Sequence, residues 1–174
     1  MDTSGGLTSL RKCSITTVTD QRCPTMIAGA MHEDAYRDYR VRMEQLLHIP
    51  TNASDQDIHE RIEAGFLADS VMALCDLGAI SSSECNQIIP LKTLKIRLAA
   101  GQRLTVQESD RVFRFVHITA MALTLFGSDE KAKRWLSKPK DRFSGKAPFA
   151  MFSTSPGTSL VEEMLIQAAE GLAF

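Results

Sequence analysis

The sequence predicts an all-α protein. From residue 34 onward, apolar residues recur at steps of three and four, as they do along one face of a helix. Helix-capping residues and helix-stopping Gly and Pro residues separate these segments. The alternation of apolar and polar residues that is typical of a half-buried strand does not occur in the sequence. We therefore expect helices only, arranged in one compact domain or two small ones, for which 174 residues suffice.

Composition places the chain among ordinary globular proteins, with 44% hydrophobic and 24% charged residues. The formal net charge of −1 argues against capture of nucleic acid by the whole surface, but it leaves room for a local basic face. Such a face is available, because residues 131–146 hold many Lys and Arg residues against a single acid, Asp141. In contrast, the chain from Ser155 onward carries glutamates and no basic residue.

Residues 1–31 are rich in Ser, Thr and Gly and show no helical period, so we expect a disordered leader. A reading frame that begins at Met31 is the alternative. The leader lacks the apolar core of a secretory signal, and no run of about 20 apolar residues could span a membrane. No two of the four cysteines have the C-x-x-C spacing of a zinc half-site. We expect reduced cysteines, a cytoplasmic location, no membrane contact, no metal and no cofactor.

The first predicted helix covers residues 34–49. Tyr36, Tyr39, Met43 and Leu46 follow one another at helical spacing along it. A small domain could leave part of this apolar stripe uncovered. We therefore expect the N-terminal segment 32–57 to contribute to a homodimer.

Residues 58–103 have the outline of a helix-turn-helix. Ser81 and Glu84 form a capping box before a short helix, and Pro90 then opens a second helix that Gly101 ends. The outer face of that second helix is basic and carries no acid. A helix of this kind fits the major groove of DNA, where Lys and Arg meet phosphates and base edges. The DNA-binding candidates are Ser82, Ser83, Lys92, Thr93, Lys95 and Arg97; an ordinary solvated surface is the alternative.

The second half of the chain predicts a buried central helix with further helices around it. Thr105 and Glu108 form another capping box, which opens a long helix to Phe126 that is apolar nearly all round. Helices of residues 129–136 and 147–152 follow. In the last helix, residues 160, 161, 164, 165 and 168 recur at helical spacing as an apolar face.

Catalytic groups do not gather in any motif. The four histidines are scattered, and no phosphate-binding loop, zinc motif or nucleophile elbow occurs in the sequence. Glu162 and Glu163 are neighbours on a helix and point apart, which does not suit an acid/base pair. Cys75 and Cys85 flank a loop and could meet as two buried thiols. We predict a protein without catalytic residues; a thiol-dependent enzyme is the competing hypothesis.

From residue 104 the chain contains several unusual sequence motifs in order: ESDR, LFG, A-x-x-W-L-x-x-P, and G-x-x-x-x-VE. With these motifs, residues 104–171 resemble the toxin-binding domain of bacterial antitoxins of the Xre/ParS/MbcA type. Residues 58–103 are similar to the Xre-like helix-turn-helix half of the same antitoxins, in which the TL-x-x-R element at 93–97 belongs to the recognition helix. The motifs IIPLKTLK and RWLSKPK resemble the antitoxins paired with RES-domain toxins.

The resemblance implies an antitoxin whose toxin-binding domain spans 104–174. It would bind and neutralise a cognate RES-type toxin, which degrades NAD, by blocking the active-site cleft, and it would repress its own operon by binding promoter DNA as a dimer. An acidic last helix could imitate the phosphates of a nucleotide. The toxin-binding candidates are Lys138, Lys140, Arg142, Phe143, Ser144, Thr158, Ser159, Glu162 and Glu163. A transcriptional regulator without a toxin, and an antitoxin that has lost DNA binding, are the alternatives.

Overall fold

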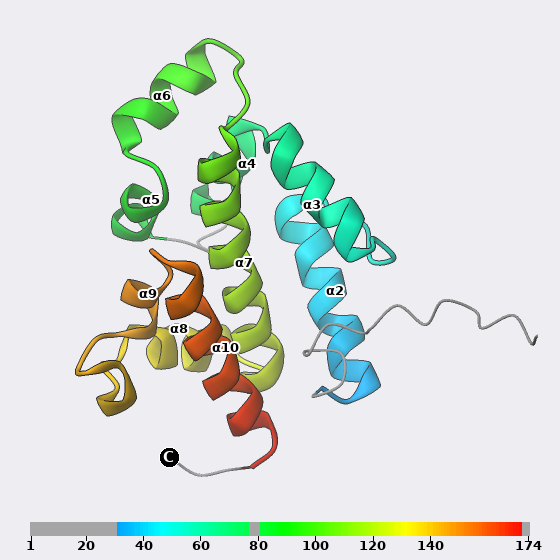
Figure 1. Cartoon of the computed structure of the whole chain (residues 1–174), viewed down its shortest axis with the longest axis vertical. Coiled ribbons are helices and arrows are strands. Elements are labelled where there is room, and N and C mark those ends of the chain that lie inside the picture. The colour runs from blue at the N-terminus through cyan, green and yellow to red at the C-terminus, as the bar shows by residue number, and fades with distance from the viewer. Residues whose placement is uncertain (1–30, 77–80, 172–174) are drawn as a thin grey trace, which may run out of the picture.

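The computed structural model describes residues 31–76 and 81–171, so nearly all of the predicted leader lies outside the described residues. The described chain is helical (Figure 1). Its elements are α2 (Glu33–Leu47), α3 (Asp55–Ala64), α4 (Ala68–Asp76), α5 (Ser82–Ile88), α6 (Leu91–Ala99), α7 (Val106–Phe126), α8 (Asp129–Ser137), the 3-10 turn η1 (Asp141–Phe143), α9 (Pro148–Met151) and α10 (Ser155–Ala169). Within these ranges the only β-type pairings are two isolated bridges, Leu67 with Arg103 and Lys140 with Lys146. The all-α prediction is confirmed.

Local hydrogen bonds explain where the helices begin. Ser54, Ser81 and Thr105 each accept a hydrogen bond from the backbone N–H three residues later. The acidic side chain at that later position accepts one from the backbone of the cap in return. The capping boxes predicted at Ser81 and Thr105 are therefore present. Thr154 caps α10, which places Pro156 inside the first turn of that helix rather than before it.

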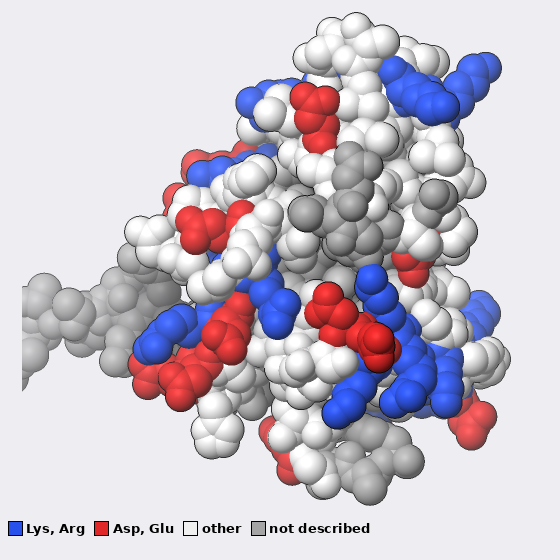
Figure 2. All heavy atoms as spheres, turned by 180° about the vertical axis from the view of Figure 1, so that it is seen from behind, with Lys and Arg blue, Asp and Glu red and all other residues white. Residues whose placement is uncertain are grey.

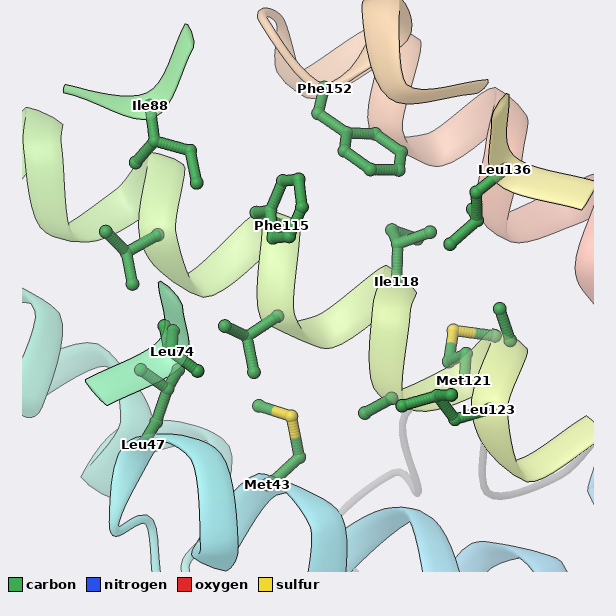
Figure 3. Packing of buried hydrophobic residues seen from close by; sticks show 14 of the residues in the cluster. Met43, Leu47, Leu74, Ile88, Phe115, Ile118, Met121, Leu123, Leu136 and Phe152 are labelled. Carbon is green, nitrogen blue, oxygen red and sulfur yellow. The ribbon is translucent and has the colours of Figure 1, made fainter. Parts of the chain in front are cut away.

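Helix α7 is the centre of the molecule (Figure 1). It packs against α2, α3 and α5, which precede it in the sequence, and against α8 and α10, which follow it. Val112, Ile118 and Met121 of α7 are fully buried. Around them lie side chains from distant parts of the sequence, among them Met43 of α2 and Leu136 of α8 (Figure 3). The prediction of a buried central helix is confirmed.

Helix α2 differs from its prediction in one respect. Its stripe of Tyr39, Met43 and Leu47 is buried within the same chain, in the core that α7 centres. Tyr36 and Leu46 of the same predicted stripe are half-buried. The chain itself therefore covers most of the stripe, and a contribution of residues 32–57 to a homodimer stays a prediction.

Gly65 allows α3 to turn back toward the start of α7. Its φ of +78° is a left-handed conformation, and a Cβ at this position would lie 2.2 Å from the carbonyl oxygen of Leu104. Next to it, the backbone N–H of Leu104 donates to the carbonyl of Phe66 at 2.8 Å. This contact fixes the segment between α6 and α7 and thereby the position of α6.

Two candidate binding surfaces

The pair α5–α6 forms the first surface. Cys85 and Ile88 of α5, Ile89 of the turn and Leu94 of α6 are buried. Because Leu94 faces the core, the opposite side of α6 is exposed and carries Lys92, Lys95 and Ile96. Exposure of the two lysines was predicted. Figure 2 shows basic side chains at the end of the molecule where α6 lies. The turn therefore presents two lysines on the outer face of the second helix, which is the placement that a recognition helix needs.

Arg97 does not belong to that exposed face. Its Nε lies 3.0 Å from a carboxylate oxygen of Glu108, and both side chains are largely buried. It also donates to the carbonyl of Arg103. The structure thus corrects the expectation that Arg97 lies on the open outer face of α6, because the guanidinium ties α6 to the first turn of α7. Its assignment to DNA contact stays a prediction. Sequence spacing could not show this, since the partner acid is contributed by the following helix.

Glu108 has two roles at this junction. Its carboxylate accepts a hydrogen bond from the backbone of Thr105 at 2.7 Å and also binds Arg97. Burial by itself would raise the pKa of Glu108, but the hydrogen bonds from Thr105 and Arg97 outweigh it and lower the pKa. The carboxylate is therefore held in its charged form at neutral pH.

The remaining DNA-binding candidates differ in how far their side chains are exposed to solvent. Ser83 is exposed, with its Oγ 3.0 Å from the Oγ of Ser81. Thr93 is half-buried, and the side chain of Ser82 lies outside the described part of the structure. Ser83, Lys92 and Lys95 are therefore the candidates that the described surface presents.

Helix α10 contributes the second surface. Val161, Met164 and Leu165 face the core and are buried. Four residues on the opposite side are exposed and form what we call the α10 stripe: Pro156, Ser159, Leu160 and Glu163. Leu160 is 40% exposed, which corrects its expected place on the inner face. It is also the functional candidate that sequence reasoning missed, because apolar spacing alone did not fix the rotation of the helix.

A tight turn lies beside α10. Lys140 and Lys146 pair across it, with the N–H of Lys140 donating to the carbonyl of Lys146 at 3.0 Å. Ser144 at its tip is exposed and has a left-handed φ of 53°. The ammonium group of Lys140 lies 4.8 Å from the centre of the Trp135 ring. Burial, followed by the charge of the exposed Lys138, lowers the pKa of Lys140.

Arg142 joins this turn to the α10 stripe. One of its terminal nitrogens lies 2.8 Å from a carboxylate oxygen of Glu163, and the other donates to the Gln167 side chain at 2.7 Å. The negative charge of Glu163 is therefore balanced within the chain. Glu162 is half-buried, with a carboxylate oxygen 3.9 Å from Nε2 of His117. Glu163 therefore does not present an unpaired charge for the imitation of a phosphate, and the contribution of Glu162 to toxin binding stays a prediction.

Three further candidates have local roles in the described structure. Phe143 is buried in the core and Thr158 is buried near the start of α10. The Thr158 hydroxyl donates to the carbonyl of Thr154 at 3.0 Å. Ser159 is exposed and donates to the carbonyl of Ser155 at 3.3 Å. Phe143 and Thr158 therefore support the surface from beneath, and their assignment to toxin contact remains a prediction.

The side chains that a thiol-dependent or histidine-dependent enzyme would use make contacts within the described core. Cys75 and Cys85 do meet: burial, and then the hydrogen bond with Cys75, raise the pKa of Cys85 to about 12, which keeps that thiol protonated. His117 accepts a hydrogen bond at Nδ1 from the Tyr39 hydroxyl at 2.7 Å when the tautomer leaves that nitrogen unprotonated. Among the described residues, no three His, Cys, Asp or Glu side chains gather as a metal site.

Within the same residues, no helix combines the length and the apolar character needed to cross a membrane. The described fold is that of a helical protein with two candidate binding surfaces, the pair α5–α6 and the exposed side of α10 with its adjoining turn.

Comparisons with known proteins place this chain in a family. The family model described as the C-terminal toxin-binding domain of Xre/MbcA/ParS antitoxins matches residues 121–171. A protein of Pseudomonas putida named "Antitoxin Xre" is 53% identical over 146 residues, which cover 84% of this chain and 92% of the relative. A Yersinia enterocolitica protein of the same name is 28% identical over 116 residues, or 65% of this chain and 78% of that relative. The chain belongs to the Xre antitoxin family.

The family match begins at residue 121, in the C-terminal part of α7. It includes α8, the turn with Arg142, and all of α10. The second candidate surface therefore lies wholly inside the region that matches a toxin-binding domain.

Proposed function

We propose that this antitoxin neutralises a RES-type, NAD-degrading toxin by placing the α10 stripe and the adjoining 140–146 turn against the toxin's active-site cleft. The observation that carries the proposal is the exposed Leu160 within the region that matches a toxin-binding domain. The antitoxin itself performs no reaction in this scheme. The chemistry belongs to the toxin, and the cytoplasm is the compartment in which both would act.

The α10 stripe suits a protein contact. Burial of a leucine side chain contributes about 1.5–3 kcal/mol, and the neighbouring Pro156 and Ser159 are short enough to let a partner surface approach closely. The ion pair of Arg142 with Glu163 holds the turn beside the helix. A polar rim around one apolar anchor is the usual anatomy of a binding hot spot.

The substitution Leu160→Asp tests this function. It places a charge at the centre of the stripe without entering the core, so we expect loss of neutralisation with an unchanged fold. The matched control is Val41→Asp on α2, because Val41 is 39% exposed and lies outside the region that matches the toxin-binding domain. Each variant is co-expressed with the toxin encoded beside it, and cellular NAD is measured. Preserved NAD with Leu160→Asp would contradict the proposal.

We also propose that the antitoxin represses its own promoter as a homodimer, with α6 in the major groove. The exposed Lys92 and Lys95 on the outer face of α6 support this assignment. A symmetric operator would require two copies of α6, and this requirement, rather than any free face on α2, is the ground for the dimer.

Gel shift with the promoter fragment tests the DNA proposal. Lys95→Glu replaces a phosphate contact by repulsion, so we expect affinity to fall roughly tenfold or more at moderate salt. Lys146→Glu, an equal change of charge on the exposed 140–146 turn, should leave the shift unchanged. If wild type and Lys95→Glu bind alike, α6 does not read DNA. If neither binds, the chain is an antitoxin that acts on its toxin alone.

A further inference from the structure

Ile96 on α6 is the most exposed large apolar side chain of the described residues, at 58%. It is not one of the DNA-binding candidates expected from the sequence. Single exposed apolar side chains are common on protein surfaces, so exposure alone assigns no role to it. The place of Ile96 on the helix, and the charges beside it, are what distinguish this residue from the others.

Contacts within the chain fix which side of α6 faces outward. Leu94 is fully buried in the core, and Arg97 is held by the carboxylate of Glu108 at 3.0 Å. Because an α-helix has about 3.6 residues per turn, Ile96 lies nearly opposite Leu94. Lys92, one turn earlier on the same side, is exposed as well. Ile96 therefore lies near the middle of the outer face of α6.

This outer face combines positive charge with one bulky apolar group. Lys92 and Lys95 lie on it beside Ile96, and α6 contains no acidic residue. The exposed Ala99 of the same face is too short to keep a partner surface at a distance. Lysines at these positions suit the phosphates that border a DNA groove. Among the base edges in the major groove, only thymine presents a methyl group.

We propose that Ile96 recognises the 5-methyl group of a thymine in each half-site of the operator. This inference rests on the proposed promoter binding and adds a base preference to it. Lys92 and Lys95 hold α6 at the phosphates, and the Ile96 side chain packs on the thymine methyl group and excludes water from it. The lysines then supply affinity for any DNA sequence, whereas Ile96 supplies discrimination between sequences.

Gel-shift titrations with deoxyuridine in place of thymidine test this contact. Deoxyuridine pairs with adenine as thymidine does, but it lacks the methyl group. Each thymine of the protected promoter site is replaced in turn, in one half-site at a time. We expect one of these replacements to weaken wild-type binding about fourfold, which corresponds to one buried methyl group. Ile96→Ala should bind the unmodified site more weakly and should not respond to that replacement, because no methyl contact remains to be lost.

Val106→Ala is the matched control. Val106 is 50% exposed, but it lies on the first turn of α7, so this variant should respond to deoxyuridine as wild type does. Circular dichroism verifies that each variant is folded. If wild type binds the promoter and no replacement weakens it, or if Ile96→Ala responds as wild type does, this inference is overturned while promoter binding stands. If wild type does not bind the promoter fragment, the proposed promoter binding fails, and the role of Ile96 fails with it.

Discussion

At the scale of single residues, the Tyr39–His117 contact links α2 to α7. The Tyr39 hydroxyl lies 2.7 Å from Nδ1 of His117, and Tyr39 is only 4% exposed. On the far side of the imidazole, Glu162 of α10 lies 3.9 Å from Nε2. Burial raises the pKa of the Tyr39 hydroxyl, which therefore keeps its proton to donate to the histidine.

The substitution Tyr39→Phe should lower the free energy of unfolding by about 1 kcal/mol near neutral pH, through loss of one buried hydrogen bond. A raised pKa stabilises the fold below the ordinary value of 10.0 for tyrosine, and this contribution is lost as pH rises above it. Wild type should therefore lose stability at alkaline pH, and the variant should lose less.

Urea titrations between pH 7 and pH 11 would measure both effects. Tyr36→Phe, on the same helix but half-buried, is the comparison; because Tyr36 contributes a little to the raised pKa of Tyr39, this variant should lie close to wild type and far from Tyr39→Phe. Part of the alkaline loss should persist in every variant, because the Cys85 thiol, with its pKa raised to about 12, changes stability in the same direction. Identical alkaline slopes for Tyr39→Phe and wild type would exclude this role of Tyr39.

At the scale of elements, the junction of α6 and α7 depends on Glu108. Glu84 has the same position in the capping box of α5, but only Glu108 also binds an arginine, with Arg97 Nε at 3.0 Å. Because Glu108 and Arg97 are both largely buried, this ion pair is screened less than a surface pair.

Replacing Glu108 by Gln should cost about 1.5–3 kcal/mol, because charge-assisted hydrogen bonds are lost and the Arg97 charge is left without its partner. Glu84→Gln is the matched change and should cost less. Since the lowered pKa of Glu108 stabilises the fold above its ordinary value of 4.5, the difference between the variants should shrink as pH falls below that value. Equal unfolding energies for the two variants at pH 7 would show that the ion pair contributes nothing.

The sequence predicted the starts of helices better than any other feature of the fold. Capping boxes are local patterns, so Ser81 and Thr105 marked α5 and α7 to within a residue. Rotation about the helix axis was harder, because it depends on which neighbour covers each face. Arg97 and Leu160 were misplaced for this reason: Glu108 draws the first inward, and the packing of α10 on the core leaves the second outside. The turn Asp141–Phe143 was missed because so short an element has no period.

At the scale of the whole molecule, α7 is shared. It packs against α2 and α3 from the first half of the chain and against α8 and α10 from the second. The sequence predicted two consecutive domains with a boundary at 103/104, but cores that share one helix are physically continuous. The contacts between Arg142 and α10, and between Tyr39 and His117, join residues far apart in sequence, so no local pattern could have predicted them.

A shared central helix predicts a single cooperative unfolding transition. Trp135, the one tryptophan of the chain, packs on Phe126 and reports on the region around α8. Its fluorescence and the far-ultraviolet circular dichroism of all helices should give coincident urea curves. Two separate midpoints would instead show that the helix pair and the toxin-binding region fold independently.

The bridge from Arg142 to Glu163 and Gln167 has a consequence for the engineering of specificity. Because the turn and the helix hold each other in place, neither segment would keep this surface if it were transferred alone to another protein. A chimera that receives α10 alone would carry Glu163 without its cation and a helix without its neighbouring turn. Under the proposed function, redirecting this antitoxin to another toxin would require residues 140–146 and α10 to be exchanged as one unit.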